Sequence, residues 1–295
     1  MKKKILSFLC CFALMFICLF TVTGCDKAET KAEIWDGTAI SVSKATKGVI
    51  KIETAEELAG LAKSVNEGND YAGVTIKLTC DIDLNNHEWT PIGFGSSNIY
   101  GYLDNEDYRW FKGTFDGQNH TISNLKITTF TGGGYEDPEA SSGVALFGHT
   151  YDATIKNLTV ETATVRGNHF VAVIAGFTCG TKIENVHVTK SNVNCTFKDL
   201  NDSGDKASTI VAFIRNSSTC DTYVKNCSAK ISVVQADRDA GQIIGCFEKL
   251  ATSSTSYTEQ DNTATDVLVS WNSTGATPNK SCTNIRNDII GRDER

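Results

Sequence analysis

The sequence repeats a short strand-like segment built around an asparagine, and this repetition restricts the fold more than any other feature. In each copy, apolar residues alternate with polar ones up to the asparagine and resume directly after it. The copies follow one another at intervals of roughly 30 to 40 residues, a period that is typical of stacked repeat proteins. Three clear copies and one fainter copy occupy residues 121–127, 154–160, 182–188 and 223–229.

The asparagine marks a bend in each copy. Ile155 and Leu158 are both apolar, so the alternation of inward and outward side chains slips by one residue at Asn157. Asparagine tolerates the left-handed backbone that such a bend needs. Bends that lie over one another would let the side-chain amides hydrogen-bond along the stack. We therefore predict an asparagine ladder made of Asn124, Asn157, Asn185 and Asn226.

The residue before the asparagine gives a second stacking signal. It is Lys156, Glu184 and Lys225 in the last three copies, so adjacent repeats would place unlike charges side by side. Short apolar strands punctuated by glycine lie between the copies. Together these patterns predict an all-β chain that folds as a parallel β-helix, a solenoid in which each turn rests on the previous one.

One amphipathic helix is expected before the repeats. Thr54 and Glu57 form a capping box, and apolar residues then recur at helical spacing up to Val65. The end turns of a solenoid expose strand edges and apolar cross-section, so they need covers. We predict that a helix at residues 55–66 covers the N-terminal end. Residues 279–295, which include three isoleucines, are the candidate for the other end.

The N-terminus has the pattern of an export signal. Three lysines at positions 2–4 precede an apolar run over residues 5–20 and then small residues, as in a secretory signal peptide. The last four residues, Val22-Thr23-Gly24-Cys25, resemble the bacterial lipobox. That resemblance implies a diacylglyceryl group on Cys25, cleavage before it and a membrane anchor outside the cytoplasm. The alternative is an uncleaved transmembrane helix, for which the run is shorter than the roughly 20 residues required.

These signals divide the chain into a lipoprotein signal peptide at 1–24, a lipidated N-terminus and tether at 25–47, and a β-helix domain at 48–295. The formal net charge is −7, and removing the leader takes away three lysines and no acid. Nucleic acid and anionic lipid heads both require clustered positive charge. We therefore expect a membrane contact through the lipid, a glycan or surface protein as ligand, and no nucleic acid.

The cysteines allow one specific disulfide prediction. Cleavage before Cys25 leaves that lipidated residue and seven other cysteines, an odd number. Cys179 and Cys220 each lie six residues before a repeat asparagine, so they should occupy adjacent turns at about the 4.8 Å strand spacing. This separation suits a disulfide, and a stack of unbonded thiols is the alternative.

A longer stretch of the chain resembles a known family. The carrying segments are the helix start at residues 54–58, the strand at 76–84, Trp89-Thr90-Pro91-Ile92-Gly93, the block at 111–122 and the strand that ends at Gly148. In this order they resemble the bacterial GLUG-repeat surface proteins. The resemblance covers residues 50–190 well and implies a pectate-lyase-like right-handed β-helix with an adhesion-like or accessory role. It supplies no catalytic residues.

Carboxylates and histidines give weak signals for a metal site. Asp81 and Asp83 lie on one face of a predicted strand, where oxygens of a neighbouring turn would complete a Ca²⁺ site; the alternative is the polar face of an ordinary strand. The five histidines have no His-x-His or His-Glu-x-x-His spacing, which argues against zinc. We expect no required cofactor and no catalytic constellation.

An aromatic loop is the best candidate for a recognition surface. Residues 94–112 mix aromatic rings with acids and an arginine, a combination that suits sugar rings and hydroxyl groups. A second insert, at 130–142, adds one more tyrosine. The alternative is that the aromatic side chains pack on the strands beneath them. The candidate ligand-binding residues are Tyr100, Tyr102, Tyr108, Arg109, Trp110 and Tyr135.

Three functions remain open from these signals. The first is a lipid-anchored, non-enzymatic surface protein that binds a glycan or a protein in the manner of an adhesin. The second is a carbohydrate-active enzyme of the polysaccharide lyase or hydrolase type, which requires carboxylates beside a basic residue on one face. The third is a structural envelope spacer, which predicts no aromatic binding surface.

Overall fold

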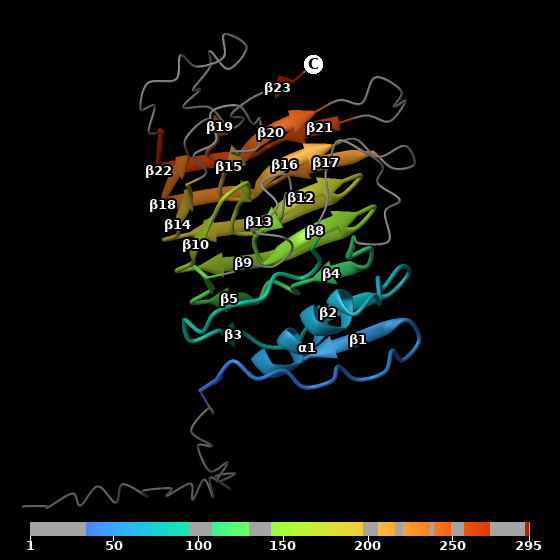
Figure 1. Ribbon diagram of the computed structural model, residues 1–295. Helices are drawn as coiled ribbons and strands as arrows, with labels where there is room; N and C mark the ends of the chain where they lie inside the picture. The colour runs from blue at the N-terminus through green and yellow to red at the C-terminus, as the bar shows by residue number, and fades with distance from the viewer. Residues whose placement is uncertain are drawn as a thin grey trace, which may run out of the picture. The chain divides into compact units, whose positions relative to one another are not determined.

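A computed structural model describes residues 34–94, 108–129, 143–196, 206–215, 221–236, 239–248, 257–271 and 293–294 (Figure 1). One compact unit begins at Ile34. Its strands lie over one another in rows from the N-terminal to the C-terminal end (Figure 1). Cys25, Tyr100, Tyr102, Tyr135 and Cys220 fall outside the described residues. No helix in the described ranges is long and apolar enough to cross a membrane.

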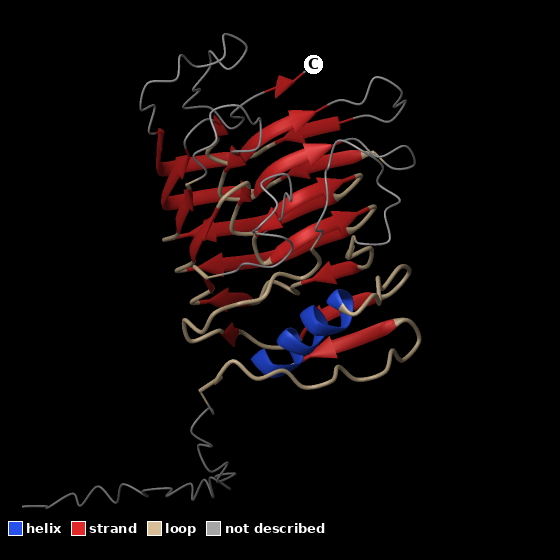
Figure 2. Cartoon of the chain, in the orientation of Figure 1, coloured by secondary structure: helices blue, strands red, loops and turns tan. Residues whose placement is uncertain are grey.

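Helix α1 (Ala55–Asn66) forms where the capping box predicts it. The backbone N–H of Glu57 donates to Thr54 Oγ1 at 3.2 Å, and Glu57 Oε2 accepts from the backbone N–H of Glu53 at 2.7 Å. These bonds satisfy donors that a helix start leaves unpaired. The helix buries Leu58, Leu61 and Val65, and it lies beside the first two strands at the end of the stack (Figure 2).

The described strands form three sheets, and every pairing between named strands is parallel. The large sheet has 14 strands and continues around the bends of the chain. Its strands are β1 (Val49–Ile52), β2 (Thr75–Leu78), β3 (Ile82–Asp83), β4 (Thr114–Asp116), β5 (Thr121–Ser123), β6 (Lys126–Ile127), β9 (Thr154–Glu161), β10 (Thr164–Gly167), β13 (Lys182–Thr189), β14 (Asn192–Cys195), β17 (Thr222–Lys225), β18 (Ser228–Ala236), β21 (Tyr257–Gln260) and β22 (Thr263–Trp271).

Two smaller sheets complete each repeat. The four-stranded sheet contains β7 (Gly143–Val144), β11 (Phe170–Val171), β15 (Lys206–Ala207) and β19 (Asp239–Ala240). The five-stranded sheet contains β8 (Phe147–Tyr151), β12 (Ala175–Cys179), β16 (Val211–Arg215), β20 (Ile244–Glu248) and β23 (Asp293–Glu294). The all-β class predicted from the sequence is therefore confirmed for the described residues.

The turn between these two sheets is tight. A Cβ atom on Gly143 would lie 2.0 Å from the carbonyl oxygen of Gly148, and one on Gly176 would lie 2.4 Å from Gly143 Cα. No side chain fits at such distances, so glycine is required where the backbones meet. The glycines that punctuate the apolar strands in the sequence therefore mark this corner.

The interior is a set of apolar columns that run along the stack. One column contains a residue from each of five successive strands, and each residue is directly opposite the next in the strand register. Burying such a side chain contributes about 1.5–3 kcal/mol, so the columns supply much of the stability. This column, at most 1% exposed, is Ile76, Phe115, Ile155, Ile183 and Val224.

Each repeat has two bends with left-handed backbone. At the first bend φ is 52° for Asn157, 54° for Asn185 and 53° for Asn226. At the second bend φ is 58° for Thr162 and 53° for Lys190. The first bend is the one that the slip in alternation predicts, and the second has no constant residue type that a sequence pattern would reveal.

Asn124 belongs to the second bend, so its predicted place in the ladder is wrong. The register pairs Thr121 with Thr159 rather than with Thr154, and the backbone N–H of Asn124 donates to the carbonyl of Glu161. In this repeat the first bend is made by Gln118 (φ 52°) and neighbouring Asn119. In this repeat the second bend carries an asparagine between apolar residues, as the first bend does in later repeats, so the sequence pattern of residues 121–127 predicts the wrong bend.

The second half of the predicted tether is packed on the domain. Trp35 is 3% exposed, and its ring lies 6.0 Å from that of Trp89. Its carbonyl accepts from Asn85 Nδ2 at 3.2 Å, and the backbone N–H of Ile40 donates to the carbonyl of Glu56 on α1. The compact unit therefore begins at Ile34 rather than at residue 48.

Candidate functional site

The structure buries Tyr108 and Trp110, the two aromatic candidates of the predicted recognition loop that lie within the described residues. Tyr108 is 6% exposed and Trp110 is 8% exposed, so neither ring presents a free face to a ligand. Arg109, between them, is half-buried; its Nη1 donates to the carbonyl of Tyr108 at 3.3 Å. The prediction that Tyr108 and Trp110 form a recognition surface is therefore wrong, because the rings have apolar partners on the sheet beneath them.

The two rings and their partners form what we call the aromatic cluster: Tyr108, Trp110, His149, Phe170, Phe177 and Phe213. The rings of Tyr108 and Trp110 are stacked at 5.1 Å. Trp110 lies 5.6 Å from Phe177, and Phe213 is stacked on Phe170 at 4.8 Å. Aromatic pairs at such distances contribute about 0.5–1.5 kcal/mol beyond their buried area.

The strand register explains why the cluster forms. His149, Phe177 and Phe213 occupy equivalent positions on β8, β12 and β16, so their rings stand in one row of the five-stranded sheet. Phe170 occupies β11 of the four-stranded sheet. The sequence shows these strands as mainly apolar, so it does not reveal which of their residues form this row. The tight turn between the two small sheets decides which side of each strand faces outward.

Cations lie over the rings of this cluster. The guanidinium of Arg215 is 5.7 Å from the ring centres of both Phe177 and Phe213. Lys206 Nζ is 5.2 Å from the centre of Phe213 and 3.6 Å from Asp239 Oδ2. Buried cations are favourable over aromatic faces because the ring quadrupole attracts them. The cluster therefore combines apolar packing with buried charge.

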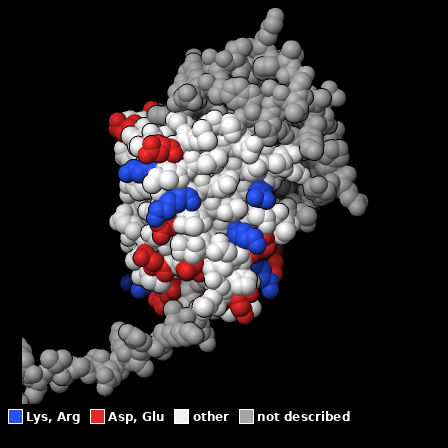
Figure 3. Space-filling view, turned by 90° about the vertical axis from the view of Figure 1, so that its left-hand side faces the viewer, with Lys and Arg blue, Asp and Glu red and all other residues white. Residues whose placement is uncertain are grey.

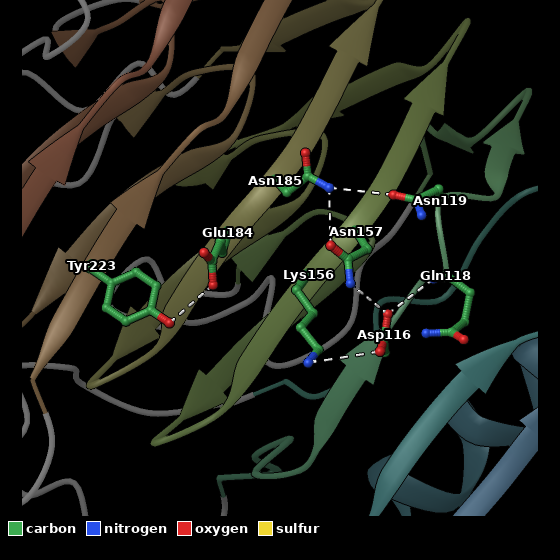
Figure 4. A network of polar contacts seen from close by, with 8 residues as sticks. All are labelled: Asp116, Gln118, Asn119, Lys156, Asn157, Glu184, Asn185 and Tyr223. Atoms are coloured by element: carbon green, nitrogen blue, oxygen red, sulfur yellow. Dashed lines mark hydrogen bonds and ion pairs between the residues drawn. The ribbon is translucent and has the colours of Figure 1, made fainter.

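The opposite kind of surface lies on the large sheet, around the network drawn in Figure 4, and we call it the polar face. Outward residues there alternate in charge from strand to strand, because the register sets each opposite the next. Such cross-strand pairs of unlike charge contribute about 0.2–1 kcal/mol each. The alternating row is Lys77, Asp116, Lys156, Glu184 and Lys225.

Amide side chains connect the strands of the polar face. Asn185 Nδ2 donates to Asn157 Oδ1 at 3.0 Å, and Asn157 Nδ2 donates to Asp116 Oδ1 at 3.0 Å (Figure 4). Asn226 has the same bend conformation as these two asparagines. Asn124 lies elsewhere, where its Nδ2 donates to Asp83 Oδ1 at 2.7 Å. The structure thus brings Asn157 and Asn185 together. The next hydrogen-bond partner of Asn157 along this face is Asp116 rather than Asn124.

Asp116 is the most strongly engaged carboxylate of this face. Burial by itself would raise its pKa, but hydrogen bonds from Asn157 and Gln118 outweigh burial and hold the pKa of Asp116 below its ordinary value. Lys156 Nζ lies 3.8 Å from Asp116 Oδ2. A carboxylate with a lowered pKa is ionised at neutral pH, so it accepts hydrogen bonds and does not act as a general acid.

Tyr223 supplies a half-buried aromatic ring on the polar face. Its hydroxyl donates to Glu184 Oε2 at 3.5 Å (Figure 4), and Lys225 Nζ lies 4.7 Å from the ring centre. Partial burial, and next the carboxylate of Glu184, raise the pKa of Tyr223. The phenol therefore stays neutral and available as a hydrogen-bonding group. No motif in the sequence points to this residue.

The two candidate calcium ligands already bind protein donors. Asp81 Oδ1 accepts from the backbone N–H of Thr121 at 2.9 Å and contacts His120 Nδ1 at 3.1 Å. Asp83 Oδ1 accepts from the backbone N–H of Asn85 at 2.7 Å as well as from Asn124. Ca²⁺ requires six to eight oxygen ligands, and N–H donors repel it. Among the described residues, no group of three metal-ligating side chains assembles around either aspartate.

Cys179 is a free, buried thiol in the structure. Burial is the main cause that raises its pKa, to about 12, so the reactive thiolate is not formed near neutral pH. The strand register places Cys179 between Tyr151 and Arg215. Its predicted disulfide partner, Cys220, lies outside the described residues, as does the lipidation candidate Cys25.

Charge is mixed on the side of the molecule shown in Figure 3. Lys and Arg side chains lie among Asp and Glu side chains, and most of the visible described surface is uncharged. A surface of this kind attracts neither strongly acidic nor strongly basic partners over long range. Recognition here would depend on short-range hydrogen bonds and contact area.

No family model matches the chain. A search of curated proteins finds halomucin of Haloquadratum walsbyi, which is 31% identical over 160 residues. That match covers 52% of this chain and 2% of halomucin, so the chain spans a very small part of that protein's length. The match indicates sequence likeness to one segment of a much larger protein.

Among solved structures, a crystal structure from Bacteroides ovatus is similar. It is provisionally named as an immunoglobulin A1 protease, and it superposes with a TM-score of 0.50 at 15% identity. The likeness covers 78% of this chain and 64% of that chain. At this identity the two proteins share the arrangement of their strands, and the comparison carries no information about activity.

Proposed function

We propose that this protein is a lipid-anchored protein of the cell surface that binds a glycan or another surface protein and catalyses no reaction. The anchor is Cys25, the last residue of the lipobox-like segment at 22–25. The observation that carries the binding proposal is the polar face, where hydroxyl, amide and charged groups stand in one constant register beside the ring of Tyr223. Aromatic rings and fixed hydrogen-bonding groups are the usual means of holding a sugar.

We further propose that the stack is a right-handed parallel β-helix of the GLUG-repeat kind. Each repeat pairs in parallel with the next, residue opposite equivalent residue. Connections between parallel strands of one sheet are right-handed in about 98% of cases, which supports the handedness. The likeness to the Bacteroides ovatus structure supports the arrangement of strands.

The carboxylates favour binding over hydrolysis. Hydrogen bonds lower the pKa of Asp81 and Asp116, and the pKa of Glu88 falls to about 2. Glycoside hydrolysis requires the reverse for one of its two carboxyls, a raised pKa that keeps a proton for the leaving group. The described carboxyls with a resolved shift therefore have the character of hydrogen-bond acceptors.

The anchor is tested by lipid labelling in a bacterial host. The full chain should incorporate labelled palmitate and fractionate with membranes, whereas the Cys25→Ala chain should incorporate none. Cys80→Ala, which changes a cysteine in the folded domain, is the matched control and should label normally. Normal processing and labelling of Cys25→Ala would exclude the anchor.

The binding surface is tested by applying the purified full chain, with its domain folded, to a glycan array. Wild-type protein should retain a defined set of glycans, and Tyr223→Ala should lose them by tenfold or more. Tyr71→Ala removes a comparable half-buried tyrosine beside α1 and should bind as wild type does. If no glycan is retained, the ligand is a protein or the spacer function holds. If the protein degrades an acidic polysaccharide in the presence of Ca²⁺, it is an enzyme and the proposal is wrong.

A further inference from the structure

A buried lysine and a buried aspartate lie next to each other beside the aromatic cluster. Lys206 on β15 and Asp239 on β19 are opposite residues in the parallel register, and Nζ lies 3.6 Å from Oδ2. The two side chains are 2% and 3% exposed. The fold therefore holds a primary amine against a carboxyl group in a place that bulk water does not reach.

The surroundings make the ionised pair costly. Phe170 precedes Lys206 in the row of the four-stranded sheet, and the ring centre of Phe213 lies 5.2 Å from Nζ. Removing an ammonium and a carboxylate from water has a large desolvation penalty, which their mutual attraction often fails to offset. A neutral product in the same position would avoid that penalty.

We propose that Lys206 and Asp239 condense to an intramolecular isopeptide bond. One ammonium proton first passes to the Asp239 carboxylate, which frees the lone pair of Nζ. Nζ then forms a bond to the carboxyl carbon of Asp239, and the bond from that carbon to the protonated oxygen breaks. This oxygen leaves as water and takes its two hydrogens from the ammonium group. The ion pair holds every atom that the step requires, so no oxidant, metal or other reactant takes part.

Proximity and water exclusion both favour this condensation. Fixing two reactants in contact raises the effective concentration by several orders of magnitude. In bulk water the amide is opposed by the excess of water, whereas in a site closed to solvent the released molecule leaves and is not readily replaced. The bond would join residues that are 33 positions apart, between two adjacent repeats.

The chain contains a matched pair in which the same reaction is not expected. Asp116 and Lys156 are also opposite residues on adjacent parallel strands, with 3.8 Å between Nζ and Oδ2. However, the Lys156 side chain is 37% exposed, and Asp116 accepts hydrogen bonds from Asn157 and Gln118. Water solvates this amine, and the carboxylate is held as an acceptor. Comparing the two pairs separates burial from mere closeness.

The experiment is a peptide map of the purified full chain after reduction, denaturation and digestion with trypsin. An amide on Lys206 blocks cleavage at that residue, so the map should contain one species in which residues 199–215 are joined to residues 239–249, lighter by one water than the two peptides together. Tandem fragmentation should place the link between Lys206 and Asp239. The pair Lys156 and Asp116 should give separate peptides.

Each outcome decides the proposal. Free peptides 199–206 and 239–249 in the wild-type map, with no joined species, would overturn it. A loss of water that maps only to Asp36 or Asp116, each of which precedes a glycine, with no joined species, would indicate succinimide formation and would also overturn it. Lys206→Arg keeps the cation without a nucleophilic amine and should lack the joined species. The wild-type map is decisive even if this variant does not fold, and the result is independent of glycan binding.

Discussion

The polar face and the aromatic cluster are built on the same repeat, but the outer side of the sheet is partly exposed in the first and buried in the second. On the polar face, outward residues such as Lys156 and Glu184 alternate in charge and remain partly exposed. On the five-stranded sheet, Phe177 and Phe213 stand in the equivalent kind of row but are covered by other rings. One constant register thus supports a solvated ladder on one side and a second apolar core on the other.

The comparison teaches that burial, rather than pairing, distinguishes the two regions. The Lys156–Asp116 and Lys206–Asp239 pairs have nearly the same separation, 3.8 and 3.6 Å, yet lysine exposures of 37% and 2%. Exposed ion pairs contribute little to stability because water screens them. A buried ion pair carries a large desolvation cost, unless its two groups react with each other. Substitutions in the two regions should therefore differ in magnitude.

The largest effect is expected in the aromatic cluster. Phe177→Ala removes a fully buried ring that contacts Trp110, His149 and Phe213. It should lower the free energy of unfolding by about 3–5 kcal/mol, because it leaves a cavity in a close-packed cluster. Urea denaturation followed by circular dichroism measures this change. A loss below about 1 kcal/mol would mean that the cluster is not a core.

A smaller loss is expected at the bend of the polar face. Asn157→Ala removes the amide bonds to Asp116 and Asn185 and places alanine at φ 52°. It should lower the free energy of unfolding by about 2–3 kcal/mol. Asn157→Gly accepts the backbone conformation and should lose only the amide part, about half as much. Equal losses in both variants would show that the amide bonds dominate and the bend costs nothing.

A third test uses pH on the polar face. Since the pKa of Asp116 is lowered in the folded protein, its contribution is fully present above its unfolded value and is lost as the pH falls through the folded one. Asp116→Asn should therefore be less stable than wild type by about 1 kcal/mol at neutral pH. The difference should shrink as the pH falls below about 4.

Denaturation midpoints of both chains across this range measure the effect. The control is Glu67→Gln, which changes an exposed carboxyl at the C-terminal cap of α1, paired with Lys63, and it should differ little in stability from wild type. A difference between Asp116→Asn and wild type that stays constant down to pH 3 would contradict the assigned role of Asp116.

The smallest effect is a gain at the second bend. Ile231 has φ 48° and is 60% exposed, so a β-branched residue occupies a backbone region that suits asparagine. Ile231→Asn should raise the free energy of unfolding by about 0.5–1 kcal/mol. Thermal unfolding compared with Val233→Asn, an exposed apolar position within the same strand, separates backbone relief from loss of apolar surface. Equal shifts in both variants would argue against strain at Ile231.

Local patterns in the sequence predicted the elements that depend on neighbouring residues. The capping box at Thr54 located α1, and the slip in alternation located the bend at Asn157. The same patterns misplaced Asn124, because the second bend of that repeat carries an asparagine like the first bend of later repeats. They also assigned Tyr108 and Trp110 to a binding surface, although both rings are buried. An aromatic loop has the same composition whether its rings face water or pack on a sheet.

By itself, the sequence determined the repeat, its β class and its first bend, since side-chain alternation and backbone preference act over a few residues. Only the tertiary structure decided which rows face outward, which carboxylates meet which amides, and that Lys206 reaches Asp239. Those outcomes depend on register between strands far apart in the chain. A slip of one residue between strands changes every cross-strand neighbour while leaving the local pattern intact.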